Sequence, residues 1–281
     1  MPQIETKNEA VRKLSGLHLY HDPLSSCAMR VRMVLIEKNL PWTSHVVDLA
    51  KMEHATPEYQ SINPHGLVPT LIHDGRTYIE SMDIIRYLDE LQPEPSLVAA
   101  DPEDRSVGDA LIADADRAQT SLKALTHEFL FRGSGRYSRE EDLKKFATGH
   151  RNTWLVDFKR SFAARDPAWQ NRVATALADM NGHFRHLEQR LAADKWLAGE
   201  TFTLADVAWT PQVHRMRLME WPMSAFPHLS RWYAQLEQRP SFQQAVIDCE
   251  PPGARATFAA YVAQRRREGT SVADALNRAA A

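Results

Sequence analysis

Cysteine is scarce in this chain. Cys27 and Cys249 are the only two among 281 residues, too few for a disulfide framework, so we expect a reducing, cytoplasmic environment. The sequence also lacks any run of about eighteen apolar residues, which excludes a membrane-spanning helix. Residues 1–16 contain no apolar core, so no secretory signal is expected there.

Neither sign of charge is in excess. The chain has 34 lysines and arginines against 36 aspartates and glutamates, a formal net charge of −2. This balance gives no general attraction to nucleic acid, and we expect neither nucleic acid nor a membrane as a partner. A chain of 281 residues, 43% of them hydrophobic, is long enough for two domains that each bury a core.

Strand-like and helix-like patterns alternate between residues 17 and 91. Their order is strand, helix, strand, weak helix, hairpin and helix, over 17–20, 26–38, 42–49, 50–63, 68–81 and 81–89. Asp74 and Gly75 lie between two apolar runs, where a tight hairpin turn needs positive φ angles. Ser81 is predicted to cap the last helix. The pattern therefore predicts a mixed domain at 17–91, preceded by an extension at 1–16.

Helical patterns alone follow in the rest of the chain. Three prolines after residue 91 interrupt the first pattern and predict a linker at 92–104. Residues 105–250 are predicted to form an all-helical domain, in which "TLAD" at 203–206 has the pattern of a capping box. The tail, 251–281, is rich in Ala and Arg and is predicted to form a final helix with a loosely held end.

Four motifs in order resemble the glutathione transferase superfamily over roughly residues 17–245. They are "SSC" at a helix start (25–27), "NPHGLVPTL" (63–71), "ESMDIIRYLDE" (80–90) and "WLAGETFTLADVAW" (196–209). The resemblance implies an α+β, thioredoxin-like N-terminal domain, an all-α C-terminal domain, glutathione as the cofactor and a homodimer. "SSCAMRVR" is similar to the zeta type and "ADVAWTPQVHRMRLM" to zeta-related dehalogenases. "DLAKMEH" is closer to the theta type and to bacterial aryl-ether-cleaving enzymes.

The resemblance also implies which residues bind glutathione. Ser81, at a helix N-terminus, offers donors to the γ-glutamyl carboxylate, and Glu80 can face the ammonium of the ligand. Val68 is implied to pair through its backbone with the cysteinyl part, beside a cis bond to Pro69. The residues alone do not show that bond, because most X-Pro bonds are trans. Ser81 as a simple helix cap is the alternative.

Lys51 and His54 are the candidates for binding the glycine carboxylate. They form a Lys-x-x-His pattern at the place where theta-type relatives use a histidine. The alternative is two solvated polar residues in a loop. Many relatives have Lys or Gln before the Val-Pro pair, whereas this chain has Leu67, which puts more weight on His54.

Ser25, Ser26 and Cys27 are the catalytic candidates. A helix N-terminus stabilises a sulfur anion, which is either the thiolate of glutathione, bonded by Ser25 or Ser26, or Cys27 itself. The alternative is a serine that only caps the helix, with Cys27 packed inward. Arg30, one turn later, either adds positive potential or is a surface charge.

A second pocket between the domains should receive the other substrate, and no metal site is expected. Its candidate lining residues, each of which also suits a core or surface position, are Asp116, Gln119, Thr120, His127, Phe131, Trp209, His214 and Arg215. The leading hypothesis is an enzyme that directs glutathione at a small, aromatic electrophile by conjugation, ether cleavage or dehalogenation. A thiol–disulfide oxidoreductase or cis–trans isomerase acting through Cys27 is the first alternative. A non-catalytic interaction protein of the same fold is the second.

Overall fold

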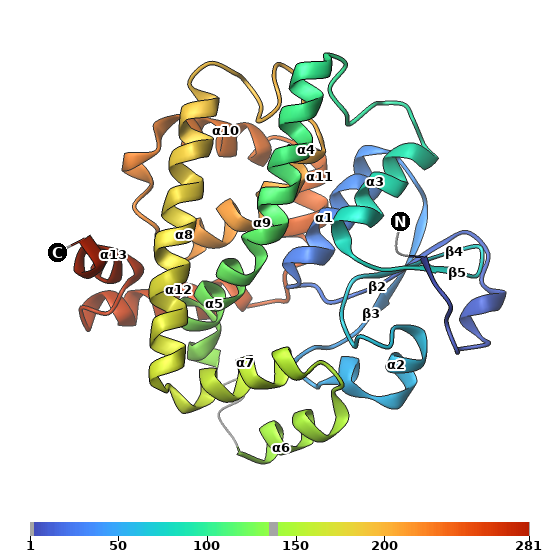
Figure 1. Cartoon of the computed structure of the whole chain (residues 1–281), viewed down its shortest axis with the longest axis horizontal. Helices are drawn as coiled ribbons and strands as arrows, with labels where there is room; N and C mark the ends of the chain where they lie inside the picture. Colours follow the sequence, from blue (N-terminus) through green and yellow to red (C-terminus); the bar gives the residue numbers. More distant parts are fainter. Residues whose placement is uncertain (1–2, 135–139, 281) are drawn as a thin grey trace.

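Two domains lie side by side in the computed structural model, which describes residues 3–134 and 140–280 (Figure 1). The first domain is a small mixed sheet with helices on both faces, and the second is built of helices. This confirms the predicted fold class. None of the helices that the structure describes combines the length and the apolar composition needed to cross a bilayer.

The sheet has five strands in the order β1-β5-β4-β2-β3. They are β1 (Gln3–Ile4), β2 (Leu17–His21), β3 (Trp42–Val46), β4 (Thr70–His73) and β5 (Arg76–Tyr78). Strands β2 and β3 are parallel, and the other neighbours are antiparallel. The predicted hairpin is confirmed, with φ of 47° at Asp74 and 76° at Gly75. Because β1 pairs with β5, Gln3 and Ile4 of the predicted N-terminal extension belong to the sheet.

Each face of the sheet is covered by its own helices. Helices α1 (Ser26–Glu37) and α3 (Ser81–Leu91) pack on the face that carries Leu19 and Leu71. The short helix α2 (Pro57–Ile62) covers the opposite face, where Ile72 joins a smaller apolar cluster. The alternation of Leu71 and Ile72 across the sheet follows from the two-residue period of a strand. Two short 3₁₀ turns, η1 (Val11–Lys13) and η2 (Glu53–Ala55), complete this domain.

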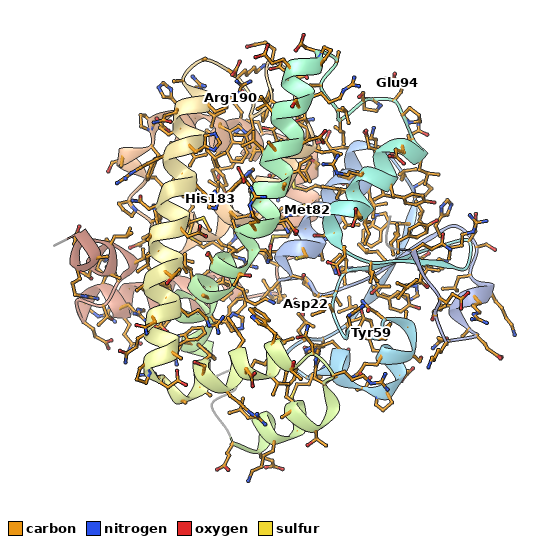
Figure 2. All side chains as sticks on the ribbon, viewed as in Figure 1. Asp22, Tyr59, Met82, Glu94, His183 and Arg190 are labelled. Atoms are coloured by element: carbon orange, nitrogen blue, oxygen red, sulfur yellow. The ribbon has the colours of Figure 1, made fainter. Side chains whose placement is uncertain are left out.

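The second domain begins earlier than the proline pattern predicts. Figure 2 shows Glu94 on the loop that joins α3 to α4. Helix α4 starts at Pro102 because Asp101 accepts hydrogen bonds from the backbone of Glu103 and Asp104, and proline suits the first helical position. Its described elements are α4 (Pro102–Arg117), α5 (Gln119–Phe129), η3 (Phe131–Ser134), α6 (Glu140–Gly149), α7 (Thr153–Ala164), α8 (Pro167–Leu191), α9 (Leu204–Leu218), η4 (Met223–Ala225), α10 (Pro227–Glu237), α11 (Pro240–Phe242) and a π-helical turn, η5 (Gln243–Ile247).

The C-terminal tail is anchored, in contrast to the expected loose end. It forms two helices, α12 (Ala254–Arg267) and α13 (Val272–Ala280). Phe258 and Val262, four residues apart on α12, are both buried, and Arg265 donates to Glu128 of α5 over 2.7 Å. An apolar stripe and a half-buried ion pair therefore hold the tail to the helical domain.

The predicted capping box is confirmed, and its aspartate holds several elements together. Asp206 is fully buried, and its two carboxylate oxygens accept from the backbone N–H groups of Leu197 and Thr203 and from the indole N–H of Trp232. The Thr203 hydroxyl is a fourth donor, at 3.1 Å. Burial raises the pKa of Asp206 to about 6, while these donors act to lower it. One side chain thus joins α9, α10 and the loop before α9.

Replacing this carboxylate should be costly. Asp206→Ala leaves three buried N–H donors without their acceptor, and each such group costs about 1–3 kcal/mol. We expect the free energy of unfolding in urea, followed by circular dichroism, to fall by at least about 3 kcal/mol. Asp101→Ala, which removes an exposed helix cap, should cost only about 1 kcal/mol. Equal losses in the two variants would contradict this role for Asp206.

Candidate functional site

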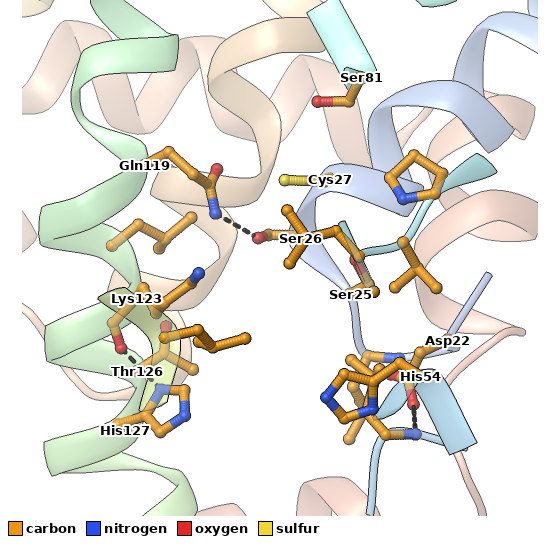
Figure 3. Close-up of a pocket in the computed structure, with 18 of the residues that line it drawn as sticks. Asp22, Ser25, Ser26, Cys27, His54, Ser81, Gln119, Lys123, Thr126 and His127 are labelled. Carbon is orange, nitrogen blue, oxygen red and sulfur yellow. Dashed lines mark hydrogen bonds between the residues drawn. The ribbon is translucent and has the colours of Figure 1, made fainter. Parts of the chain in front are cut away.

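A cavity of about 280 Å³ lies between the two domains (Figure 3). One wall comes from the start of α1, the loop before β4 and the start of α3. The opposite wall comes mainly from α5 and α7. The predicted glutathione site and the predicted second pocket therefore form one continuous space.

The start of α1 brings the three catalytic candidates to this cavity. Ser25 is the N-cap, and its Oγ accepts from the backbone N–H of Ala28 at 3.2 Å. Ser26 Oγ accepts from the side-chain amide of Gln119 on α5 at 2.9 Å, a contact that crosses between the domains. Cys27 Sγ lies 3.6 Å from a guanidinium nitrogen of Arg30. All three side chains line the cavity.

Arg30 is a buried cation behind this helix start and not a surface charge. Its side chain is fully buried, and its Nε donates to the carbonyl of Ala208 on α9 at 2.9 Å. Burial lowers the pKa of Arg30, whereas the neighbouring Cys27 and Asp116 act to raise it. The positive charge adds to the partial charge of the helix N-terminus, so negative charge on a nearby sulfur is favoured.

The loop before β4 presents an extended backbone to the cavity. The Val68–Pro69 bond is cis, as the resemblance implied. The Leu67 carbonyl accepts from the Tyr59 hydroxyl at 2.6 Å and from the Asn63 amide at 2.9 Å. Within the described residues, the N–H and C=O of Val68 make no hydrogen bond, so both are available to a strand-like ligand.

Glu80, and not Ser81, is the N-cap of α3. Its backbone has φ of 65° and ψ of 110°, and Ser81 is the first residue of the helix. Figure 3 shows the Ser81 hydroxyl at the end of the cavity nearest α3. Burial and the neighbouring Asp116 raise the pKa of Glu80. A helix N-terminus beside a carboxylate suits a ligand that carries both a carboxylate and an ammonium.

His54 lines the cavity, whereas Lys51 does not. His54 is buried, with its ring centroid 5.5 Å from those of both Phe146 and His150. The Lys51 side chain is 76% exposed and pairs with Asp48. Because Met52 between them has φ of 62°, the two side chains diverge. The expectation that Lys51 contributes to the cavity is corrected by this turn.

The helical wall carries five of the residues expected there. Asp116, Gln119, His127, Phe131 and Arg215 line the cavity.

Three other residues proposed for this wall lie elsewhere. Thr120 is exposed, since it follows Gln119 by one residue and so points away from the cavity. Trp209 is fully buried and donates to the Leu111 carbonyl at 2.9 Å. His214 is buried between the Tyr233 hydroxyl and Glu250. These side chains serve the core or the surface, and they correct the predicted pocket.

Several lining residues were not predicted from the sequence. Lys123 and Thr126 continue the face of α5 that carries the predicted Gln119 and His127, at spacings of three and four residues. Helical spacing from Gln119 is a signal in the sequence that indicates these residues. Lys159 of α7 also lines the cavity, but no local pattern indicated it. His150 lies behind His54 and holds the Gly66 carbonyl at 2.9 Å.

Comparison with known families agrees with both domains. The family model of the glutathione S-transferase N-terminal domain matches residues 19–96. That of the glutathione S-transferase C-terminal domain matches residues 167–235. The two matches together span half of the chain, and neither reaches residues 97–166, which carry Lys123 and Lys159.

Individual relatives cover most of the chain. Glutathione S-transferase Z2 of Arabidopsis thaliana is 29% identical, over 84% of this chain and 92% of its own. The tetrachloro-p-hydroquinone reductive dehalogenase of Sphingobium chlorophenolicum is 25% identical, over 82% of this chain and 95% of its own. The crystal structure of the beta-etherase LigF from Sphingobium sp. strain SYK-6 shares the fold, with a TM-score of 0.75 at 22% identity over 83% of this chain and 99% of that one. The chain belongs to the glutathione S-transferase family, whose members use glutathione as their cosubstrate.

Proposed function

We propose that the protein activates the thiol of glutathione at the start of α1 and directs it at a small aromatic electrophile. The observation that carries this proposal is the geometry of Ser25. Its oxygen accepts from the Ala28 N–H, so its own proton is left to donate to a sulfur anion in the cavity. The thiolate attacks the electrophilic carbon, a C–S bond forms, and the leaving group departs with its bonding electron pair.

The rest of glutathione fits the same wall. Its cysteinyl backbone would pair with the free N–H and C=O of Val68, and its γ-glutamyl end with Ser81 and Glu80. Its glycine carboxylate would lie toward His54, at the opposite end. These assignments are part of the proposal and follow the polarity of the cavity.

An aromatic electrophile suits the other wall. Phe131, His127 and Leu122 line the cavity opposite Ser25. The named substrate of one relative is a chlorinated hydroquinone, and another relative is a beta-etherase. We favour conjugation, ether cleavage or dehalogenation of such a compound.

A thiol-transfer or isomerisation reaction through Cys27 is a second candidate. Cys27 Sγ faces the cavity and has the buried Arg30 guanidinium 3.6 Å away. A sulfur so placed can attack the disulfide of oxidised glutathione, forming a mixed disulfide and releasing one glutathione thiolate. We also propose a cytoplasmic location, which the two free cysteines support.

Serine and cysteine variants separate the two candidates. We expect Ser25→Ala to lower the rate of glutathione conjugation ten- to a hundredfold, because one hydrogen bond to the thiolate is worth about 1.5–3 kcal/mol. Cys27→Ala should leave conjugation nearly unchanged. Steady-state assays with a chlorodinitrobenzene measure the conjugation rate, and mass spectrometry of the parent detects a glutathione adduct on Cys27. A Cys27 glutathione adduct, together with loss of thiol transfer in Cys27→Ala, would support the second candidate. Full conjugation and thiol-transfer activity of the Ser25→Ala/Cys27→Ala double variant would exclude the proposed roles of both residues.

The affinity for glutathione should depend on the charge of Glu80. Because the carboxylate would bind the ammonium of the ligand, affinity is present above the raised pKa of Glu80 and is lost as the pH falls through it. Glu80→Gln should weaken binding about three- to tenfold near neutral pH and flatten this dependence. Calorimetry with S-methylglutathione, which has no thiol to titrate, measures both effects. The same pH profile in parent and variant would rule out this contact.

The protein should form a homodimer in which the first domain packs on the helical domain of the partner. This arrangement rests on the family resemblance. Light scattering at micromolar concentration should give twice the mass of one chain. A single species with the mass of one chain would contradict it.

A further inference from the structure

Two acidic and two cationic side chains of the cavity lie at different ends, and Asp22 and Arg215 also line it. Glu80 and Asp116 are close enough for the charge of Asp116 to raise the pKa of Glu80, and both lie near Ser81. Lys123 and Lys159 belong to the other end, where both act to lower the pKa of His150. Glutathione accounts for the acidic end through its ammonium. The glycine carboxylate of glutathione is proposed to lie toward His54 on the wall of the first domain, whereas Lys123 and Lys159 belong to α5 and α7 on the opposite wall.

Lys123 is the cation best placed toward the reacting sulfur. It follows Gln119 by one turn of α5, and the Gln119 side-chain amide donates a hydrogen bond to Ser26 Oγ. The Lys123 amino group points into the cavity in Figure 3, and the neighbouring Cys27 acts to raise the pKa of Lys123. The ring of Trp154 lies 4.9 Å from Nζ, and the ring of Phe158 lies 6.0 Å from it.

This ammonium has no counter-ion in the part of the chain that the structure describes. Across residues 3–134 and 140–280, Nζ of Lys123 makes neither a hydrogen bond nor an ion pair. Burial lowers its pKa, which reflects the cost of holding the charge there. A partly buried ammonium that has only aromatic rings beside it is less favourable than one with a counter-ion, and an anion in the cavity would lower that cost.

A second polar group lies on the same face of α5. Thr126 is three residues after Lys123 and is 6% exposed, and within the described residues its hydroxyl has no hydrogen-bond partner. A hydroxyl can donate to the same oxygen anion that an ammonium attracts. Leu122, Leu155 and Phe131 surround this pair with apolar and aromatic surface.

We propose that Lys123, assisted by Thr126, binds a carboxylate on the aromatic electrophile and so selects anionic substrates over neutral ones. The inference rests on the proposed function, because it assumes that glutathione occupies the opposite wall. An ammonium facing an apolar aromatic surface matches a ring that carries a carboxylate. The residues involved lie outside the two family-matched segments.

A matched pair of ligands tests the proposal directly. A chloronitrobenzoate and its carboxamide, each with the nitro group ortho to chlorine, react chemically with glutathione. The thiolate sulfur replaces chlorine, which leaves as chloride with the bonding pair. The two conjugates differ only in the charge of one ring substituent, and calorimetry gives their dissociation constants without requiring turnover.

We expect the parent to bind the carboxylate conjugate at least about tenfold more tightly than the carboxamide conjugate. Lys123→Met should abolish this preference while leaving the affinity for glutathione within about twofold. Lys123→Arg should retain most of the preference. The control Lys144→Met removes an exposed lysine of α6 that pairs with Glu140, and it should change neither value.

Each other outcome overturns the proposal in a distinguishable way. Equal affinity of the parent for both conjugates, with normal glutathione binding, shows that the cavity does not select anions. A loss of glutathione affinity in Lys123→Met as large as the loss for the carboxylate conjugate shows that Lys123 holds glutathione itself. No binding of glutathione to the parent would refute the proposed function as well.

Discussion

Two buried arginines on α1 connect this helix to the second domain. Arg30 donates to the Ala208 carbonyl at 2.9 Å, and Arg32 donates to the Ala245 carbonyl at 2.8 Å. Arg32 also holds the carbonyls of Asp22 and Pro23, just before the helix. Hydrogen bonds from charged donors to buried carbonyls are stronger than those from neutral donors. The position of Ser25 relative to the helical wall depends on these contacts.

A second consequence is that the site exists only between the domains. Ser26 is bonded to Gln119 across the cavity, and the Gly66 carbonyl is held by His150 from the helical domain. The backbone that would pair with glutathione is therefore positioned partly by the helical domain, which is proposed to receive the other substrate. The same hydrogen bonds therefore position the wall proposed for glutathione and the wall proposed for the other substrate. Two reactants bound on these walls would be held in a fixed relative orientation.

Local patterns predicted the elements and the first wall well, because these depend on neighbouring residues. The Asp74-Gly75 turn, the Thr203–Asp206 capping box and the helix start at Ser25 each follow from a few adjacent side chains. The second wall depends on which face of a long helix meets the other domain. Trp209 and His214 were predicted to line the pocket between the domains, yet both are buried in the core. Lys123 was not predicted for the same reason. Lysine is usually exposed to solvent, so the sequence gives no sign that this side chain faces the cavity.

The observed helix cap and the proposed reactive role are compatible at Ser25 because of the chemistry of a hydroxyl. One oxygen can accept from the Ala28 N–H and donate its own proton in another direction, so Ser25 can do both. Ser26 Oγ likewise accepts one hydrogen bond, but from the side-chain amide of Gln119, and this contact directs the Ser26 side chain toward the helical wall. Cys27 faces the same space beside Arg30 but makes no helix cap. The three consecutive residues therefore differ in which of their atoms already make hydrogen bonds within the protein.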